Sequence, residues 1–215
     1  MIARRIKWSG ISDTRLFDPI ETRLLEIING KLKRDDTQYV SWLVQLLAFS
    51  GQTKYLPTLQ GIQDGSIGKG LPPKLLRHTE SSIAVLPDFN RWNPIIYANL
   101  DQVTEGSLER QRVINMLNST EDSLVRVGAS FVYDFYFSDK EIVELVNRLL
   151  LEKHSQATNN DELSESVAWL CKALGETDNP EYVATLEAVK SNATVGSVKR
   201  WSDKSLRKLR KTVGQ

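Results

Sequence analysis

The segment Gly65–Gly70 combines three glycines with a lysine, a composition that could hold a phosphate group. A phosphate-binding loop of the GxxxxGK[ST] type would need a glycine at position 63 and a hydroxyl residue at position 70. The chain has Gln63 and Gly70 there, and no predicted strand precedes the segment. We therefore predict a flexible loop between helices rather than a nucleotide site.

The two histidines and the single cysteine do not form a metal-binding or nucleophilic arrangement. His78 and His154 are far apart, and neither has a cysteine or a second histidine at ligand spacing. Cys171 lies beside Leu170 and Leu174 of a predicted core helix, where a thiol is buried and inert. We predict no catalytic residues, no metal ligands and no cofactor, and a protein that is not an enzyme.

The composition is that of an ordinary globular protein. The chain has 215 residues, of which 40% are hydrophobic and 26% are charged. No apolar run is long enough to span a membrane, and residues 1–10 lack the apolar region of a secretory signal. We therefore expect a cytoplasmic protein, with export as the alternative if a signal peptide was removed ahead of Met1.

An internal repeat is the strongest architectural signal. Residues 42–62 and 169–189, about 125 positions apart, share six of 21 residues without a gap, against roughly one or two expected by chance. The shared pairs are Trp42/Trp169, Leu43/Leu170, Leu47/Leu174, Tyr55/Tyr182, Thr58/Thr185 and Leu59/Leu186. Such a repeat predicts stacked units with a common core, in which Trp42 and Trp169 occupy equivalent buried positions.

Four helices are predicted in the first copy, residues 18–87. Asp18 and Pro19 supply a cap and a proline at the first helical position, so the first helix should begin there. The second is expected at 36–50 and a short third around Tyr55. The fourth should run from Pro73 to Pro87, which is expected to end it.

The second copy, residues 139–211, repeats this order. Ser138 and Glu141 form a predicted capping box, Gly175 is expected to end the next helix, and Asn179 should start the third. The linking region 88–137 is expected to hold an irregular stretch up to about Val103, followed by helices near 105–117 and 121–137. The aromatic segment 131–137 continues the apolar stripe of the second of these and is predicted to be helical despite its strand-like composition.

The segment 118–129 resembles the HEAT-repeat pattern, in which an inter-helix turn carries an aspartate and the next helix opens with Val-Arg-x-x-Ala. The resemblance implies that Asp122 caps this helix, that Arg126 ties neighbouring repeats together and that Ala129 permits close helix contact. It implies an all-α, right-handed α-α superhelix, a HEAT-like solenoid of the armadillo-type superfamily. We accordingly expect about ten helices in a single domain, residues 1–215, with an internal duplication.

Two features are not explained by the repeat and are candidates for binding a partner. The first is the predicted insertion 89–97, and the second is the C-terminal helix, where residues 199–215 hold seven Lys or Arg and one Asp. The alternatives are that the insertion covers exposed helix ends and that the basic helix is a polar cap. The candidate partner-binding residues are Arg91, Trp92, Tyr97, Lys204, Arg207, Lys208 and Lys211.

The absence of a catalytic constellation favours a protein-interaction scaffold or adaptor whose partner is another protein. Nucleic-acid binding, as in glycosylase-type HEAT-like proteins, is the first alternative, and the near-neutral isoelectric point disfavours it. A HEAT-like lyase of the phycobilisome-lyase group is the second alternative.

Overall fold

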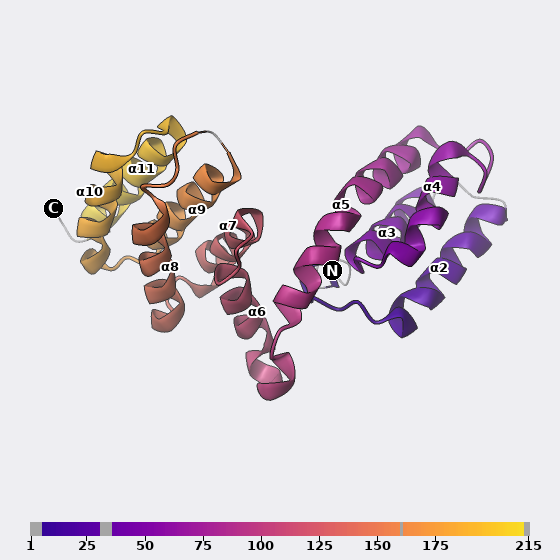
Figure 1. The fold of residues 1–215 in the computed structure, drawn as a ribbon, viewed down its shortest axis with the longest axis horizontal. Helices are drawn as coiled ribbons and strands as arrows, with labels where there is room; N and C mark the ends of the chain where they lie inside the picture. Colours follow the sequence, from indigo (N-terminus) through magenta and orange to yellow (C-terminus); the bar gives the residue numbers. More distant parts are fainter. Residues whose placement is uncertain (1–5, 31–35, 160, 213–215) are drawn as a thin grey trace. The chain divides into compact units, whose positions relative to one another are not determined.

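The computed structural model describes residues 6–30, 36–159 and 161–212, and it is all-α, since these residues contain no strand (Figure 1). The chain divides into two compact units, unit 1 (Met1–Thr104) and unit 2 (Glu105–Gln215). Each unit has its own cluster of buried apolar side chains.

The structure gives bounds for four α-helices within the described residues of unit 1, with a 3₁₀ turn ahead of the third. They are α2 (Thr14–Asn29), α3 (Thr37–Phe49), η2 (Thr53–Tyr55), α4 (Leu56–Asp64) and α5 (Pro73–Tyr97), followed by the 3₁₀ turn η3 (Leu100–Gln102). The helix α3 packs against both α2 and α5, and α4 packs against α5.

Unit 2 adds one further helix pair ahead of the same order. Its elements are η4 (Glu105–Ser107), α6 (Leu108–Leu117), α7 (Asp122–Phe131), the π-helical turn η5 (Val132–Tyr136), α8 (Lys140–Lys153), α9 (Glu162–Glu176), η6 (Pro180–Tyr182), α10 (Val183–Asn192) and α11 (Gly196–Thr212). The segment 131–137 is helical up to residue 136, as predicted.

Two predicted helix starts are wrong because a neighbouring aspartate supplies the cap. The first helix begins at Thr14, where the Asp13 carboxylate accepts a hydrogen bond from the Arg15 N–H at 2.9 Å. Because α2 begins earlier than predicted, it includes Phe17, whose side chain is fully buried in the core. In unit 2 Asp139, rather than Ser138, caps α8 by accepting from the Ile142 N–H.

The predicted end of the fourth helix at Pro87 is also wrong. The helix α5 continues through Pro87 and Pro94 to Tyr97, so the expected irregular stretch 88–97 is helical. An internal proline costs a helix about 3 kcal/mol. Burial of Leu86, Phe89 and Ile96 on one face offsets that cost, since a buried side chain of this size contributes about 1.5–3 kcal/mol.

Gly175, predicted to end the central helix of the second copy, lies inside α9. A Cβ atom at this position would lie 2.5 Å from the Cβ atom of Ser205, so glycine allows α9 and α11 to approach closely. The left-handed residue that follows α9 is Asp178, with φ of 53°, and in unit 1 the residue 127 positions earlier, Gly51, has φ of 67°.

Every buried position of α3 is also buried in α9, which buries Ser164 and Ser166 in addition. The seven buried residues of α3 recur 127 positions later as buried residues of α9. They are Val40, Ser41, Leu43, Val44, Leu46, Leu47 and Ala48, which correspond to Val167, Ala168, Leu170, Cys171, Ala173, Leu174 and Gly175.

The repeated tyrosine and threonine also make matching hydrogen bonds. The Tyr55 hydroxyl donates to the Asp18 carboxylate at 2.6 Å, and the Tyr182 hydroxyl donates to the Glu144 carboxylate at 2.7 Å. Three residues after each tyrosine, Thr58 donates to Glu21, and Thr185 donates to the Asn147 side chain. Each pair fastens the short third helix to the first helix of the same copy.

The repeated tryptophan is not a core residue in either copy, contrary to the prediction. The side chain of Trp42 is 46% exposed, and Trp169 is only partly buried at the edge of the core. Trp42 directly precedes the buried Leu43, and successive helical residues are about 100° apart, so Trp42 is turned away from the core.

Two substitutions in α3 should therefore differ in cost. Leu47→Ala should lower the free energy of unfolding by about 2–5 kcal/mol, because it leaves a cavity in the core. Trp42→Ala should lower it by less than about 1 kcal/mol, because nearly half of the side chain is already in water. Urea denaturation followed by circular dichroism measures both, and equal losses would place Trp42 in the core after all.

Candidate functional site

A lysine held between two tryptophans lies at the centre of the most distinctive surface of unit 2. The Lys172 ammonium is 3.5 Å from the centroid of the Trp169 ring, three residues earlier on α9. It is also 4.1 Å from the centroid of Trp201, on α11. Because α9 and α11 pack side by side, residues about 30 positions apart in the sequence meet here.

Two more cations surround the same tryptophan. The Lys204 ammonium is 4.5 Å from the Trp201 centroid, and the Arg200 guanidinium is 5.8 Å from it. Each such contact contributes about 0.5–1 kcal/mol at an exposed site. We call Trp169, Lys172, Arg200, Trp201 and Lys204 the cationic–aromatic cluster.

No carboxylate in the described part of the chain neutralises the positive charges of this cluster. Among the residues that the structure describes, no ion pair joins Lys172, Arg200 or Lys204 to a carboxylate. The pKa of Lys172 is lowered, first by partial burial and then by the positive charges of Arg200 and Lys204. The cluster is thus a site of like-charge repulsion that an incoming anion would relieve.

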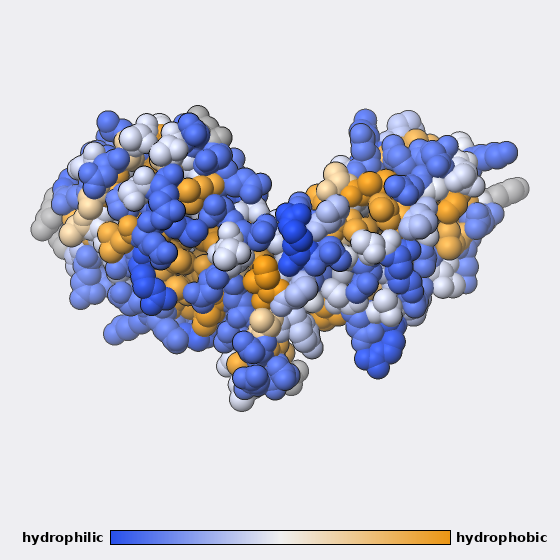
Figure 2. All heavy atoms as spheres, viewed as in Figure 1, coloured by the Kyte–Doolittle hydropathy of each residue, from blue (hydrophilic) through white to orange (hydrophobic). Residues whose placement is uncertain are grey.

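Aromatic side chains extend this surface along α7 and the π-helical turn. The Tyr133 ring meets the Trp169 ring edge to face, with centroids 6.0 Å apart. Phe135, in the same turn, is 61% exposed. Figure 2 shows one face of the molecule, where apolar residues emerge among mostly hydrophilic ones.

Two of the predicted binding cations of α11 form ion pairs with carboxylates and so differ from those of the cationic–aromatic cluster. Lys208 forms an ion pair with Glu176 at 2.5 Å, and Arg207 forms one with Asp203 at 2.7 Å. Lys204 belongs to the cationic–aromatic cluster, and Lys211 is exposed in the last turn. The predicted basic face is therefore partly neutralised.

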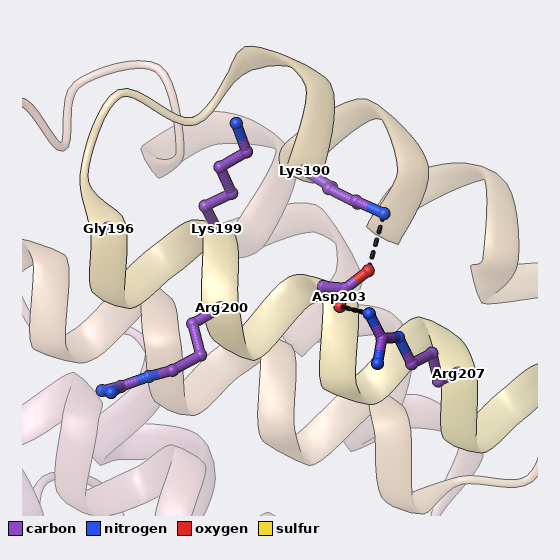
Figure 3. A pocket seen from close by; sticks show the side chains of 6 residues that line it. All are labelled: Lys190, Gly196, Lys199, Arg200, Asp203 and Arg207. Atoms are coloured by element: carbon purple, nitrogen blue, oxygen red, sulfur yellow. Dashed lines mark ion pairs between the residues drawn. The ribbon is translucent and has the colours of Figure 1, made fainter.

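A shallow pocket of about 460 Å³ lies beside α11, centred on Asp203 (Figure 3). Lys190, from α10, and Arg207 both turn toward the Asp203 carboxylate, and the Lys190 ammonium is 2.6 Å from it. Lys199 and Arg200 extend away from Asp203. Four cationic side chains thus line the pocket with one carboxylate, and two of the four are paired with it.

The other predicted binding residues, on α5, are not brought together on an insertion. Trp92 is 9% exposed and packs against Phe89 and Trp8, with ring centroids 5.4 and 5.9 Å away. It cannot serve as the interface anchor that the sequence suggested. Arg91 is exposed and pairs with Asp88 at 2.9 Å, and the Tyr97 side chain is 50% exposed.

In unit 1 the counterparts of Lys172 and Trp201 form a neutral pair, while Arg77 corresponds to Arg200. The start of α11 corresponds to the start of α5, so Trp201 matches His78, and Lys172 matches Gln45. The Gln45 amide nitrogen lies 3.2 Å from His78 Nδ1, a neutral hydrogen bond in place of a cation–π contact. The fold therefore does not require positive charge at this position.

Of the three residues to which the HEAT-like pattern assigns a role, Asp122 has a different role in the structure. Glu121 precedes α7 as its N-cap, and Asp122 instead pairs with Lys153 at 2.9 Å, which corrects the predicted capping role. Arg126 of α7 pairs with Glu165 of α9 at 2.7 Å, and Ala129 is fully buried.

No metal site or membrane span emerges from the described ranges. No group of three or more His, Cys, Asp or Glu residues is placed to hold a metal ion within them. Likewise, none of the described helices is both long and apolar enough to cross a bilayer.

Comparison with protein-family models, with curated proteins and with solved structures found no match.

The Cys171 thiol should be unreactive in the folded protein. It is fully buried, and burial raises its pKa to about 12, so almost no thiolate forms at neutral pH. A thiol-specific chromogenic disulfide reagent should not label the native chain and should label it stoichiometrically in denaturant. Rapid labelling of the native chain would contradict the burial.

The pKa of Lys172 should lie below the ordinary value of a lysine, and Lys204→Gln should raise it by removing one repelling charge. NMR titration of the lysine ε-carbons measures the Lys172 pKa in the wild type and in the Lys204→Gln variant. Because the folded-state pKa is lowered, the unfavourable contribution of Lys172 to stability is present at lower pH. It fades as the pH rises through the folded and then the unfolded pKa. An unchanged Lys172 pKa in the variant would show that the charges do not interact.

Proposed function

We propose that this chain is a non-catalytic interaction protein that binds an acidic partner protein through the cationic–aromatic cluster of unit 2. The observation that carries the proposal is the gathering of Lys172, Arg200 and Lys204 around Trp201 without a neutralising carboxylate among the described residues. Unit 1 has a neutral pair in place of Lys172 and Trp201, so the fold does not require a lysine at position 172.

We further propose that the helix pairs form a HEAT-like right-handed solenoid with an internal duplication. The common register of the buried residues in α3 and α9 supports the duplication. So do the two matched hydrogen bonds of Tyr55 and Tyr182. The ion pair between Arg126 and Glu165 joins α7 to α9, the role that the HEAT pattern implies for this arginine.

An acidic protein fits the cluster better than a nucleic acid does. Proteins that bind single strands stack bases on aromatic faces and hold the backbone with cations. Here Lys172 already lies over Trp169, and three cations surround Trp201. A base would have to displace these cations, whereas the carboxylates of a protein partner reach them directly.

The tryptophans give the partner an anchor in addition to charge. Tryptophan, tyrosine and arginine dominate the binding energy of protein interfaces. Tyr133 of η5, Trp169 of α9 and Trp201 of α11 each expose part of their rings, and cations lie against the two tryptophans. Long-range attraction to the cations should mainly set the association rate, and contact with the rings should set the dissociation rate.

Charge reversal at the cluster tests this function. The double variant Lys172→Glu, Lys204→Glu should bind a labelled glutamate-rich peptide at least about tenfold more weakly than the wild type, a loss of about 1.4 kcal/mol. Fluorescence anisotropy measures the dissociation constant, and the wild-type affinity should fall with added salt.

The matched control is Lys74→Glu, Arg77→Glu on α5, which changes the net charge equally in unit 1. It should bind the peptide as the wild type does. Equal losses in both double variants would show a nonspecific charge effect and would refute the site. Tighter binding to an oligothymidine of equal charge would favour the nucleic-acid alternative.

A further inference from the structure

The shallow pocket beside α11 is a further surface of unit 2 on which cations outnumber acids (Figure 3). It has a volume of about 460 Å³ and lies where α10 packs against α11. Four cations and one carboxylate give its lining a net charge of +3. We call it the α10–α11 pocket, and its lining residues are Lys190, Gly196, Lys199, Arg200, Asp203 and Arg207.

The four cations of the pocket are of two kinds. Lys190 and Arg207 pair with the Asp203 carboxylate at 2.6 and 2.7 Å, and the hydrogen bond from Lys190 is the main cause that lowers the pKa of Asp203. Lys199 and Arg200 are exposed and extend away from Asp203 in Figure 3. Neither of them forms an ion pair with a carboxylate of the described chain. The one acid of the pocket is therefore occupied by the first two cations and leaves the other two uncompensated.

Unit 1 has a groove between the matching helices, α4 and α5, and its lining is not cationic. The groove has a volume of about 550 Å³ and is lined by Gln60, Gln63, Asp64 and Ile83. Gln63 corresponds to Lys190, since the two are 127 positions apart, as Tyr55 and Tyr182 are. A neutral amide in unit 1 thus takes the place of a cation that holds Asp203 in unit 2.

The long last helix shows the same replacement. The helices α5 and α11 begin at Pro73 and Gly196, so Lys199 corresponds to Leu76 and Arg207 corresponds to Ala84. Of the four cations, Arg200 alone has a basic counterpart, Arg77. The other three have uncharged counterparts, so the fold does not require the charge of this pocket.

We propose that the α10–α11 pocket binds a phosphorylated serine or threonine of the partner protein. A phosphate monoester carries a charge of about −1.5 to −2 and three acceptor oxygens, so one group contacts two or more cations at once. A carboxylate carries a single negative charge and would leave most of the excess positive charge of the pocket uncompensated. Clusters of arginine and lysine are a recurring means by which proteins recognise phosphorylated side chains.

The form of the pocket suits the end of a side chain that a partner presents. Its volume falls within the roughly 300–1,000 Å³ of ligand sites, but the pocket is shallow, so a ligand is held from one side. Lys199 and Arg200 can turn toward a phosphate without breaking an ion pair of the described chain. Lys190 and Arg207 meanwhile stay paired with Asp203 and keep that acid compensated.

Arg200 joins this pocket to the cationic–aromatic cluster, because its guanidinium also lies 5.8 Å from the centroid of the Trp201 ring. The inference rests on the proposed function, and it specifies the partner as an acidic protein with a phosphorylated residue beside its acidic segment. Apart from Arg200 the two sites have separate residues. A substitution of Lys199 therefore reports on the pocket alone.

A peptide without carboxylates tests the pocket directly. A blocked glycine–serine peptide with one phosphoserine should shift the amide NMR signals of Gly196, Lys199 and Asp203 in the ¹⁵N-labelled full chain, and the shifts should saturate. The unphosphorylated peptide should leave these signals in place. Lys199→Gln should weaken binding at least about threefold, as expected for the loss of one exposed charged contact. The double variant Lys190→Gln, Lys199→Gln should weaken it at least about tenfold.

The matched control is Lys211→Gln, which removes one exposed charge from the same helix outside the pocket. It should bind the phosphopeptide as the wild type does. Circular dichroism verifies that each variant is folded.

A second pair of peptides tests the link to the acidic partner. A phosphoserine within the glutamate-rich peptide should tighten its binding to the wild type about tenfold. Lys199→Gln should remove most of this gain and leave the affinity for the unphosphorylated glutamate-rich peptide unchanged. Lys172→Glu should weaken binding of the glutamate-rich peptide and retain the response to the glycine–serine phosphopeptide. Failure of the pocket is therefore distinguishable from failure of the cationic–aromatic cluster.

Three results would overturn the proposal. The first is equal binding of the phosphorylated and unphosphorylated glycine–serine peptides, and the second is an equal loss of affinity in Lys211→Gln and Lys199→Gln. The third is tighter binding of inorganic phosphate or of an oligothymidine than of the phosphopeptide, which would assign the pocket to a free anion or to a nucleic acid.

Discussion

Burial of the central helix on two sides is the constraint on which each unit depends. The helices α3 and α9 each pack against the helix before them and the long helix after them, so most of their positions face a neighbour. Close packing of this kind tolerates little change of side-chain volume. That is why the register of buried residues is retained in both copies, from Val40 and Val167 through Ala48 and Gly175. The hydrogen bonds of Tyr55 and Tyr182 then fix the short third helix at a matching position in each copy.

The sequence predicted the helical class and the buried leucines because the 3.6-residue period carries that information locally. It failed where tertiary contacts override a local rule. Pro87 has a strong tendency to end a helix, yet Phe89 and Ile96 gain enough burial beyond it for α5 to continue. Trp42 was placed in the core because it is large, apolar and repeated, although Leu43 beside it already occupies the buried side. When two adjacent residues of a helix are both large and apolar, residue type alone does not tell which of them is buried.

The candidate site was less predictable than the fold, since it depends on contacts between distant residues. The basic composition of α11 was evident, but its ion pairs were not, and they remove Arg207 and Lys208 from the uncompensated charge. Lys172 belongs to a helix that is otherwise mostly apolar, and only the packing of α11 on α9 brings it against Trp201. A lysine three residues after a tryptophan is the sequence signal that could have identified it, because such residues share a helix face.

The two units differ most at surface positions that packing does not constrain. Unit 1 pairs Gln45 with His78, a neutral hydrogen bond. Unit 2 has Lys172 and Trp201 at these positions, and the lysine lies against the tryptophan ring. Gathering like charges is unfavourable, because each cation disfavours the charged form of its neighbours. The same backbone accommodates a neutral pair in unit 1, so the fold does not impose this repulsion on unit 2. A partner that brings carboxylates to the cationic–aromatic cluster would relieve it.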